Sequence, residues 1–118
     1  MIQRGDVVIV AFPYVSGASG KNHPALVIQA DPNNQRLANT IVAMITGNTR
    51  LAATEPTQVL IDPTTTEGKT SGLAYLSAIK CENLYTVAQQ DIIRTVGRLS
   101  AALMVQVDAS LKVALGLP

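Results

Sequence analysis

Short apolar runs separated by turn-forming residues dominate the chain from Val7 to Cys81. The runs are rich in Val, Ile, Leu and Tyr, and the breaks between them are rich in Gly, Pro, Asn, Asp and Thr. This spacing is typical of an antiparallel sheet. It predicts strands at residues 7–12, 25–30, 40–45, 58–61 and 76–81.

Several of these runs are apolar at every position instead of alternating with polar residues. Such strands are usually buried on both faces, as in a closed barrel or in a sheet covered by a helix or a second subunit. The segments DPNNQ at 31–35 and DPTTTEGKTSG at 62–72 have the composition of turns, and the second is long and threonine-rich enough to be mobile.

The spacing of apolar residues changes near the C-terminus. From Ser100 onward they recur every three or four positions, which predicts one amphipathic helix that buries Leu103, Met104, Val107, Leu111, Ala114 and Leu115. Ser100 is suited to cap the first turn, and Gly116 to end the last one. Asp108 and Lys112 lie four positions apart, so we expect a weak pair worth about 0.3 kcal/mol on the polar face.

The composition bounds the architecture and the surface. A chain of 118 residues fits one domain over residues 1–118. Hydrophobic residues make up 47% and charged residues 14%, so we expect a partner to cover part of the surface. No apolar run approaches the roughly 18 residues of a membrane helix. The first residues lack a signal-peptide cleavage pattern, which favours a cytoplasmic protein without a membrane partner.

Cysteine and histidine usage limits the chemistry. The chain has one cysteine, Cys81, and one histidine, His23, so it can form neither an internal disulfide nor a structural zinc site of about four ligands. We therefore expect no metal and no cofactor. The net charge of +1 gives no general attraction to nucleic acid, so a polyanion would have to be held by a local basic patch.

Five stretches, taken in order, carry a resemblance to a known family. They are RGDVVIVAFPYVSGASG at 4–20, HPALVIQAD at 23–31, NTIVAMIT at 39–46, GLAYLSAIKCENLYTV at 72–87 and GRLSAALMVQVDASLKVALGL at 97–117. An opening RGD is weak alone, but these motifs in this order are specific together. From about Arg4 to Leu117 the chain resembles the MazF/PemK (Kid) toxin family.

The resemblance implies a mainly β fold with a C-terminal α-helix, namely an SH3-like barrel of antiparallel strands that acts as a homodimer. It also implies a metal-independent endoribonuclease that cuts single-stranded RNA at short sequences. A MazE/PemI-like antitoxin with an acidic C-terminal segment is the expected partner. Composition and periodicity alone predict only a β-rich domain with one helix and a covered face.

Metal-free RNA cleavage needs a base for the 2′-hydroxyl, an acid for the 5′-oxygen and positive donors for the phosphorane. His23 stands where the family has an arginine, just before the PALVI strand, and unlike arginine it can exchange protons near neutral pH. Thr46 stands where the family has a hydroxyl beside that arginine, which implies a hydrogen bond to the scissile phosphate. Without the resemblance, His23 would be a solvated or capping residue as often as a functional one.

A second pair of candidates lies in IKCENLYTV. The family pattern has a catalytic Arg and Asp two positions apart, which become Lys80 and Glu82 here. On a strand these two side chains share one face, and Cys81 between them points to the other as a small hydrophobe. Taken alone, Lys80 and Glu82 would be an exposed ion pair of little energetic value. Either His23 or Glu82 can be the base, with the other as the acid.

The remaining candidates would bind RNA rather than cleave it. Tyr14 in the first loop and Tyr85 after the catalytic pair can stack unpaired bases. Lys21 can replace the positive charge missing at position 23, and Asn22 and Asn83 flank the two catalytic segments. Further loop cations form a possible RNA path only collectively, and they are Arg36, Arg50 and Lys69.

Two other functional readings remain open. The related CcdB toxins share the fold and poison gyrase by contact without hydrolysis, but this chain lacks their C-terminal tryptophan. A weakened toxin that dimerises and binds its antitoxin is the other alternative, because the family arginines are replaced at His23 and Tyr85.

Overall fold

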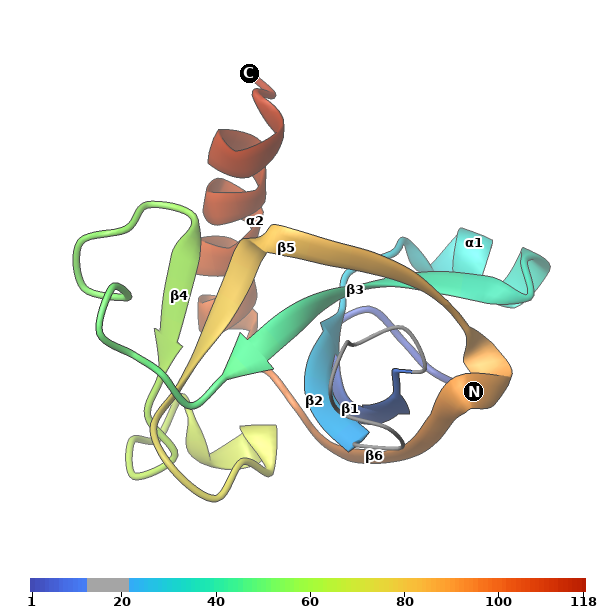
Figure 1. The fold of residues 1–118 in the computed structure, drawn as a ribbon, viewed down its shortest axis with the longest axis horizontal. Helices are drawn as coiled ribbons and strands as arrows, with labels where there is room; N and C mark the ends of the chain where they lie inside the picture. Colours follow the sequence, from blue (N-terminus) through green and yellow to red (C-terminus); the bar gives the residue numbers. More distant parts are fainter. Residues whose placement is uncertain (13–21) are drawn as a thin grey trace.

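The computed structural model describes residues 1–12 and 22–118 (Figure 1). The strands are β1 (Asp6–Ala11), β2 (Asn22–Val27), β3 (Asn39–Thr46), β4 (Gln58–Ile61), β5 (Ser77–Ala88) and β6 (Ile92–Arg98). The helices are α1 (Asp31–Arg36) and α2 (Ala101–Leu115), with 3₁₀ turns η1 (Lys69–Ser71) and η2 (Gln89–Asp91).

All the strands pair antiparallel in one sheet of order β4-β5-β3-β2-β1-β6. The mainly β fold with a C-terminal helix is confirmed. The expected closed barrel is corrected, because β4 and β6 are the two edges of the sheet and do not pair with each other. Figure 1 shows that the open sheet instead curls strongly on itself where β1, β2 and β6 lie.

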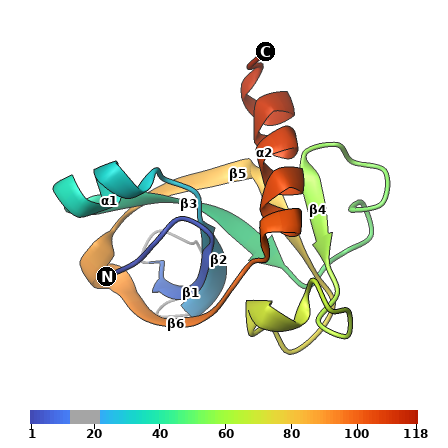
Figure 2. The ribbon, with the colours of Figure 1, turned by 180° about the vertical axis from the view of Figure 1, so that it is seen from behind.

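The curled sheet has a core on each face. One core lies between the sheet and α2, which packs across β4 and β5 (Figure 2). The other fills the inside of the curl. Val7 and Val8 are adjacent in β1 but belong to different cores. This confirms the expectation that the continuously apolar strands are buried on both faces.

Helix α2 begins and ends as the sequence predicts. The Ser100 hydroxyl accepts a hydrogen bond of 3.2 Å from the Leu103 backbone N–H, and Gly116 ends the helix at φ +69°. Leu103, Val107 and Leu111 are buried, each side chain stabilising the fold by roughly 1.5–3 kcal/mol. Leu115, expected in the core, is exposed.

The expected pair between Asp108 and Lys112 is wrong. The Asp108 carboxylate instead lies 2.7 Å from the Arg4 guanidinium, and no ion pair with Lys112 is present among the described residues. Arg4 comes from the opposite end of the chain and is also held by the Ile28 carbonyl at 2.8 Å. The Asp108 carboxylate therefore pairs with a residue distant in the sequence and not with a neighbour in its own helix.

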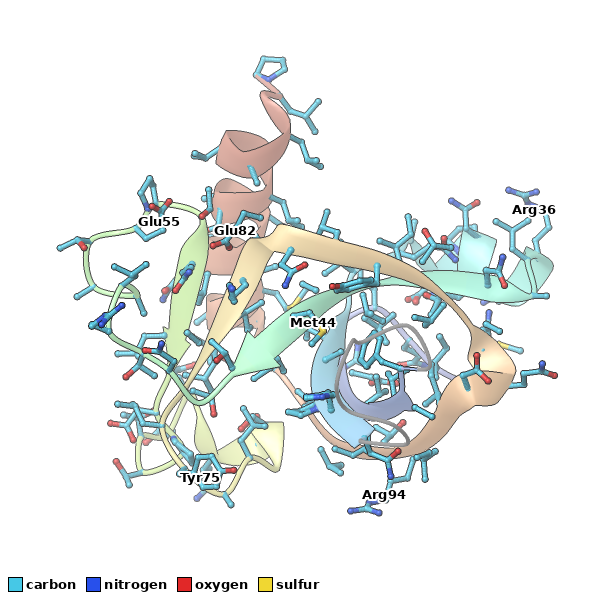
Figure 3. All side chains as sticks on the ribbon, in the orientation of Figure 1. Arg36, Met44, Glu55, Tyr75, Glu82 and Arg94 are labelled. Atoms are coloured by element: carbon cyan, nitrogen blue, oxygen red, sulfur yellow. The ribbon has the colours of Figure 1, made fainter. Side chains whose placement is uncertain are left out.

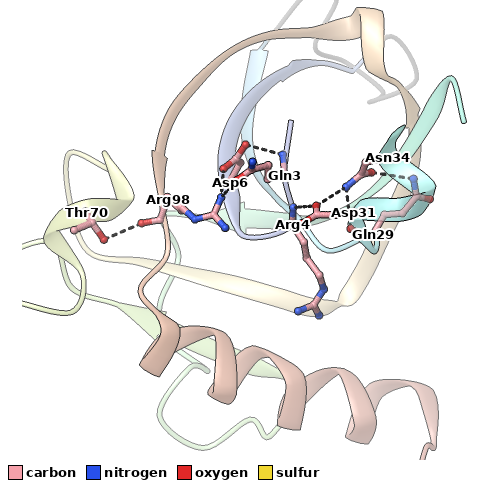
Figure 4. Close-up of polar contacts among 8 residues, drawn as sticks. All are labelled: Gln3, Arg4, Asp6, Gln29, Asp31, Asn34, Thr70 and Arg98. Carbon is pink, nitrogen blue, oxygen red and sulfur yellow. Dashed lines mark hydrogen bonds and ion pairs between the residues drawn. The ribbon is translucent and has the colours of Figure 1, made fainter. Parts of the chain in front are cut away.

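The opening RGD motif forms hydrogen bonds that link distant segments of the chain (Figure 4). The Arg4 N–H donates to Asp31 at 2.6 Å, and the Asp6 carboxylate accepts from Arg98 at 2.9 Å and from the Gln3 N–H at 2.8 Å. Gly5 between them takes φ +96°, which favours glycine. This motif joins β1 to the start of α1 and to the end of β6.

Three elements, α1, β5 and β6, differ most from the sequence expectation. Residues 31–35, expected as a turn, begin α1, where Pro32 fits the first helical turn. Buried Asn34 accepts a hydrogen bond of 3.0 Å from Gln29 (Figure 4) and one of 2.6 Å from Thr40, so local polar contacts hold this short helix. Strand β6 was not expected, and the strand predicted at 76–81 continues to Ala88. Within the described ranges, no helix has the length and apolar character needed to cross a membrane.

Candidate functional site

A cavity of about 560 Å³ opens where β2 and β3 approach the segment before β5 and the edge strand β6. His23 and Thr46, the first two catalytic candidates, both line it. Asn22, one of the candidates for RNA binding, also lines it. The other lining residues are Ile9, Pro24, Ile45, Gly47, Gly72, Leu73, Ala74, Tyr75, Ser77, Arg94 and Val96.

Strand register places these residues on neighbouring strands. Ala25 pairs with Met44, and continuing that register by two residues sets His23 opposite Thr46. Ile9 pairs with Pro24 on one side and with Arg94 on the other. Arg94 therefore lies two strands from the start of β2, about 10 Å across the sheet.

His23 is half-buried at the start of β2. Its ring meets Phe12 edge to face, with ring centroids 6.0 Å apart and an interplanar angle of 63°. Its Nε2 is buried and has no hydrogen-bond partner in the part of the chain that the structure describes. An unpaired buried nitrogen costs free energy that a bound hydrogen-bonding group would recover.

Thr46 lies between two hollows. Beside the main cavity, a smaller one of about 70 Å³ is lined by Thr46, Asn48, Leu51, Gln58 and Lys80. The Thr46 hydroxyl accepts a hydrogen bond of 3.1 Å from the Asn48 N–H, and its own hydrogen remains to donate. Thr46 can therefore contact a group in either hollow.

Lys80 shares a face of the sheet with Thr46. Lys80 pairs with Met44 on β3 and with Gln58 on β4, and paired residues point to the same side. Met44 and Thr46 are two positions apart on β3, so they too share that side. The register thus aligns a cation, a hydroxyl and an imidazole across three neighbouring strands.

Glu82 breaks this arrangement because β5 bulges beside Lys80. Met44 pairs with Lys80 but the preceding Ala43 pairs with Leu84, so residues 81–83 have no partner on β3. The Glu82 carboxylate accepts a hydrogen bond of 2.8 Å from Gln58, and no ion pair joins it to Lys80. Glu82 and Lys80 nevertheless both adjoin Gln58, and Cys81 between them faces the core.

Cys81 is packed in the core beneath α2, which confirms the expectation of a small hydrophobe on the other face. Burial raises the pKa of this thiol to about 11, with smaller contributions from the negative charges of Glu82 and Asp108. A thiol with this pKa stays protonated near neutral pH and is a poor nucleophile.

The other RNA-binding candidates have different surroundings. The half-buried Tyr85 ring packs against Phe12 with centroids 5.3 Å apart, in the core inside the curl. Asn83 lies on the β5 bulge. Tyr14 and Lys21 lie outside the described residues. Stacking or phosphate binding by these four remains a prediction.

Tyr75 and Arg94 are cavity residues that the sequence analysis missed. Figure 3 shows both on the lower side of the molecule, away from Glu82 and Arg36. Arg94 comes from the unexpected strand β6, and Tyr75 from the segment just before β5. Only the β-branched residues of IIRTV mark β6 in the sequence, and nothing local places either residue beside His23.

Comparison with known proteins connects this chain to a family. The profile of the family described as "PemK-like, MazF-like toxin of type II toxin-antitoxin system" matches residues 3–115. The chain is 37% identical to endoribonuclease MazF6 of Mycobacterium tuberculosis over 114 residues, covering 95% of each chain. It is 31% identical to endoribonuclease MazF9 of the same organism over 121 residues, covering 99% of this chain and 98% of the relative.

Solved structures agree on the fold. An endoribonuclease in complex with its cognate antitoxin, from mycobacterial species, aligns with a TM-score of 0.80 at 23% identity, covering 100% of this chain and 98% of that one. Similarity at this identity supports the fold, while the family profile and the two relatives extend over nearly the full sequence. The chain therefore belongs to the PemK-like, MazF-like toxin family of type II toxin–antitoxin systems.

Proposed function

We propose that this chain is a toxin that cleaves single-stranded RNA at the cavity lined by His23 and Thr46. The observation that carries the proposal is the convergence of these two side chains in one cavity. The names of the relatives, which are endoribonucleases, support the same activity. We further propose that cleavage is sequence-specific and needs no metal or cofactor.

The reaction is an attack of the RNA 2′-hydroxyl oxygen on the adjacent phosphorus. The bond from phosphorus to the 5′-oxygen breaks, leaving a 2′,3′-cyclic phosphate and a 5′-hydroxyl. A base takes the 2′ proton, and an acid donates a proton to the departing oxygen. The reaction as written balances without a further reactant, and we assign both proton transfers to side chains.

His23 is the proton-transferring group of this cavity in our proposal, because it lines the cavity with Thr46 and its Nε2 has no hydrogen-bond partner among the described residues. The Thr46 hydroxyl donates a hydrogen bond to the scissile phosphate. Lys80, in the adjoining hollow, stabilises the extra negative charge on the phosphorane. Glu82, held by Gln58, is the second candidate for proton transfer and acts from the bulge.

The test is cleavage of a long single-stranded RNA by purified protein in excess chelator, with the new 5′ ends mapped. We expect discrete cuts and 5′-hydroxyl ends. His23→Ala should lower the cleavage rate by about 10²- to 10⁴-fold between about pH 6 and 8, the usual contribution of general acid–base catalysis. Arg36, one of the cations considered for an RNA path, lies on α1 away from Tyr75 and Arg94 (Figure 3), so Arg36→Ala is the matched control and should cut at the wild-type rate.

Full activity of His23→Ala across that range would contradict the role of His23. Intact RNA with the wild-type protein would contradict the nuclease proposal itself. Blocked gyrase in that case would indicate a CcdB-like poison, and tight antitoxin binding alone would indicate a weakened toxin.

We also propose that residues 1–118 act as one domain, in a cytoplasmic homodimer that an antitoxin with an acidic C-terminal segment inhibits. The antitoxin bound to the structural relative supports this partner. Exposed apolar side chains of α2 support a covered surface, and they include Val105, Val113 and Leu115. Light scattering with and without antitoxin measures both associations, and a monomer at micromolar concentration would contradict the dimer.

A further inference from the structure

The wall of the main cavity holds an aromatic side chain with no role in the proposed cleavage. Tyr75 lines the cavity and is 70% exposed. Its ring edge passes 3.6 Å from the position that a side chain on Gly47 would occupy, directly after Thr46. An exposed aromatic face therefore stands next to one of the proposed catalytic residues.

The backbone beneath this ring is held firmly. The Ser77 hydroxyl donates a hydrogen bond of 2.9 Å to the Tyr75 carbonyl. At Gly72, φ is +73° and an added Cβ would lie 2.0 Å from the Val96 carbonyl oxygen, so this segment touches β6 without room for a side chain. Fixed backbone below an exposed ring is a suitable platform for stacking, since little conformational entropy is lost on binding.

Arg94 supplies a positive charge on the far wall. Its guanidinium has neither a hydrogen bond nor an ion pair with any other described residue, although Arg4 and Arg98 each bind a carboxylate. Arg94 is exposed on the edge strand and lines the cavity. A guanidinium without a protein partner is free to bind a phosphate through two parallel hydrogen bonds.

The remaining walls are suited to a nucleotide. Ile9, Pro24, Leu73 and Val96 are apolar, while Asn22 and Ser77 are polar. The volume of about 560 Å³ falls within the roughly 300–1,000 Å³ of small-ligand sites. Single-stranded RNA is recognised through bases splayed onto aromatic rings and phosphates bound by cations.

We propose that this cavity binds the nucleotide next to the scissile phosphate, with its base stacked on Tyr75 and its phosphate held by Arg94. Tyr75 is then a specificity-determining residue, and Arg94 supplies the permanent positive charge that His23 lacks. This inference rests on the proposed RNA cleavage for its position relative to the cut, but its binding contacts are testable without cleavage.

The experiment uses single-stranded RNA oligonucleotides that carry 2-aminopurine, whose fluorescence falls when the base stacks. Each carries a 2′-O-methyl group at the cut position, so it binds without being cleaved, and the fluorophore is placed on either side. We expect quenching at one position with the wild type and Tyr75→Phe. Tyr75→Ala should lose that quenching and bind about 5- to 150-fold more weakly, the effect of losing one base stack.

Two exposed residues at α1 provide matched controls. Leu37→Ala removes exposed apolar surface outside the cavity and should leave quenching unchanged. Arg94→Ala should weaken binding whereas Arg36→Ala, the removal of an equal charge at a distance, should not (Figure 3). Tyr75→Ala should also cut with a relaxed base preference at one position beside the cleaved bond.

Wild-type quenching and wild-type cut sites in Tyr75→Ala would overturn this inference while leaving the nuclease intact. If the protein never cut RNA, 2-aminopurine would be placed at each position in turn. Tyr75-dependent quenching in that case would overturn the proposed RNA cleavage and leave the binding site standing. Equal losses in Arg94→Ala and Arg36→Ala would overturn the phosphate contact of Arg94.

Discussion

Two buried polar atoms among the described residues lack a hydrogen-bond partner, and both lie at the candidate site. His23 Nε2 borders the main cavity, and Gln58 Oε1 belongs to a residue that lines the smaller one. Folded proteins leave few such atoms, so each calls for a specific explanation. Here both are explained if bound RNA provides the missing donors and acceptors.

Cys81 provides a residue-scale test of the core. Its pKa rises to about 11 in the fold from 9.0 in an exposed thiol, so between these pH values the folded state keeps a proton that the unfolded state loses. The stabilising contribution of Cys81 is thus complete below about pH 9 and is lost as pH rises toward 11. We expect the urea midpoint to fall over this range, and to fall less in Cys81→Ala.

Comparison of the two proteins at each pH removes the shared titration of lysines and tyrosines. An independent measurement is alkylation by iodoacetamide near neutral pH, which should label Cys81 only after unfolding because the thiol is buried and protonated. Rapid labelling of the folded wild type, or an identical pH dependence in Cys81→Ala, would contradict the buried, protonated thiol.

Some residues of the main cavity could be predicted from the sequence and others could not. His23 and Thr46 adjoin recognisable strand motifs, so their placement at one site followed from matching those motifs to a family. Tyr75 and Arg94 reach the same cavity through pairing between distant strands. Ile9 pairs with Arg94 across 85 positions of sequence, and no local pattern encodes that contact.

The segment from Gly72 to Ser77 shows how elements position the site. Gly72→Ala should destabilise the fold by more than about 2 kcal/mol, because a left-handed φ costs roughly 1–2 kcal/mol and the new methyl group would overlap the Val96 carbonyl. Gly116→Ala is the matched control, with a similar φ of +69° and no atom of the described residues within 4 Å of the added Cβ. It should lose only about 1 kcal/mol.

Urea unfolding of both variants measures this difference. Equal losses in Gly72→Ala and Gly116→Ala would show that the close approach to β6 contributes nothing. A cleavage defect confined to Gly72→Ala is also expected, since Gly72 lines the main cavity and supports the segment that carries Tyr75.

Elements were predictable where local signals are strong. The cap and stop of α2 gave its boundaries within a residue, and β4 matched its predicted range. Helix α1 was missed because Asp, Pro and Asn favour both a turn and a first helical turn. The bulge in β5 was also missed, because it depends on how β3 pairs and not on the composition of β5.

Charge at the scale of the whole molecule is nearly balanced. The net charge of +1 implies that RNA affinity comes from a few local cations and not from the overall field. We therefore expect a shallow salt dependence, with log K falling by about 0.7 for each neutralised phosphate per unit of log salt. Fluorescence anisotropy across a salt series measures this slope.

Arg94→Ala should make the slope less steep by about 0.7, the value for losing one phosphate contact. Arg36→Ala keeps the same net charge as Arg94→Ala and should preserve the wild-type slope. A slope that changes equally in both variants would indicate that overall charge, not position, governs RNA binding.

The bulge at residues 81–83 separates the residues of β5 that pair with β3 from those that do not. The β5 residues before and after the bulge pair with β3. A substitution that shifted this register by one residue would move their side chains to the opposite face of the sheet. Asn83 has no partner on β3, and Glu82 is kept for the proposed proton transfer. Substitution at Asn83 is therefore expected to change which RNA sequences are cut without altering how the sheet is assembled.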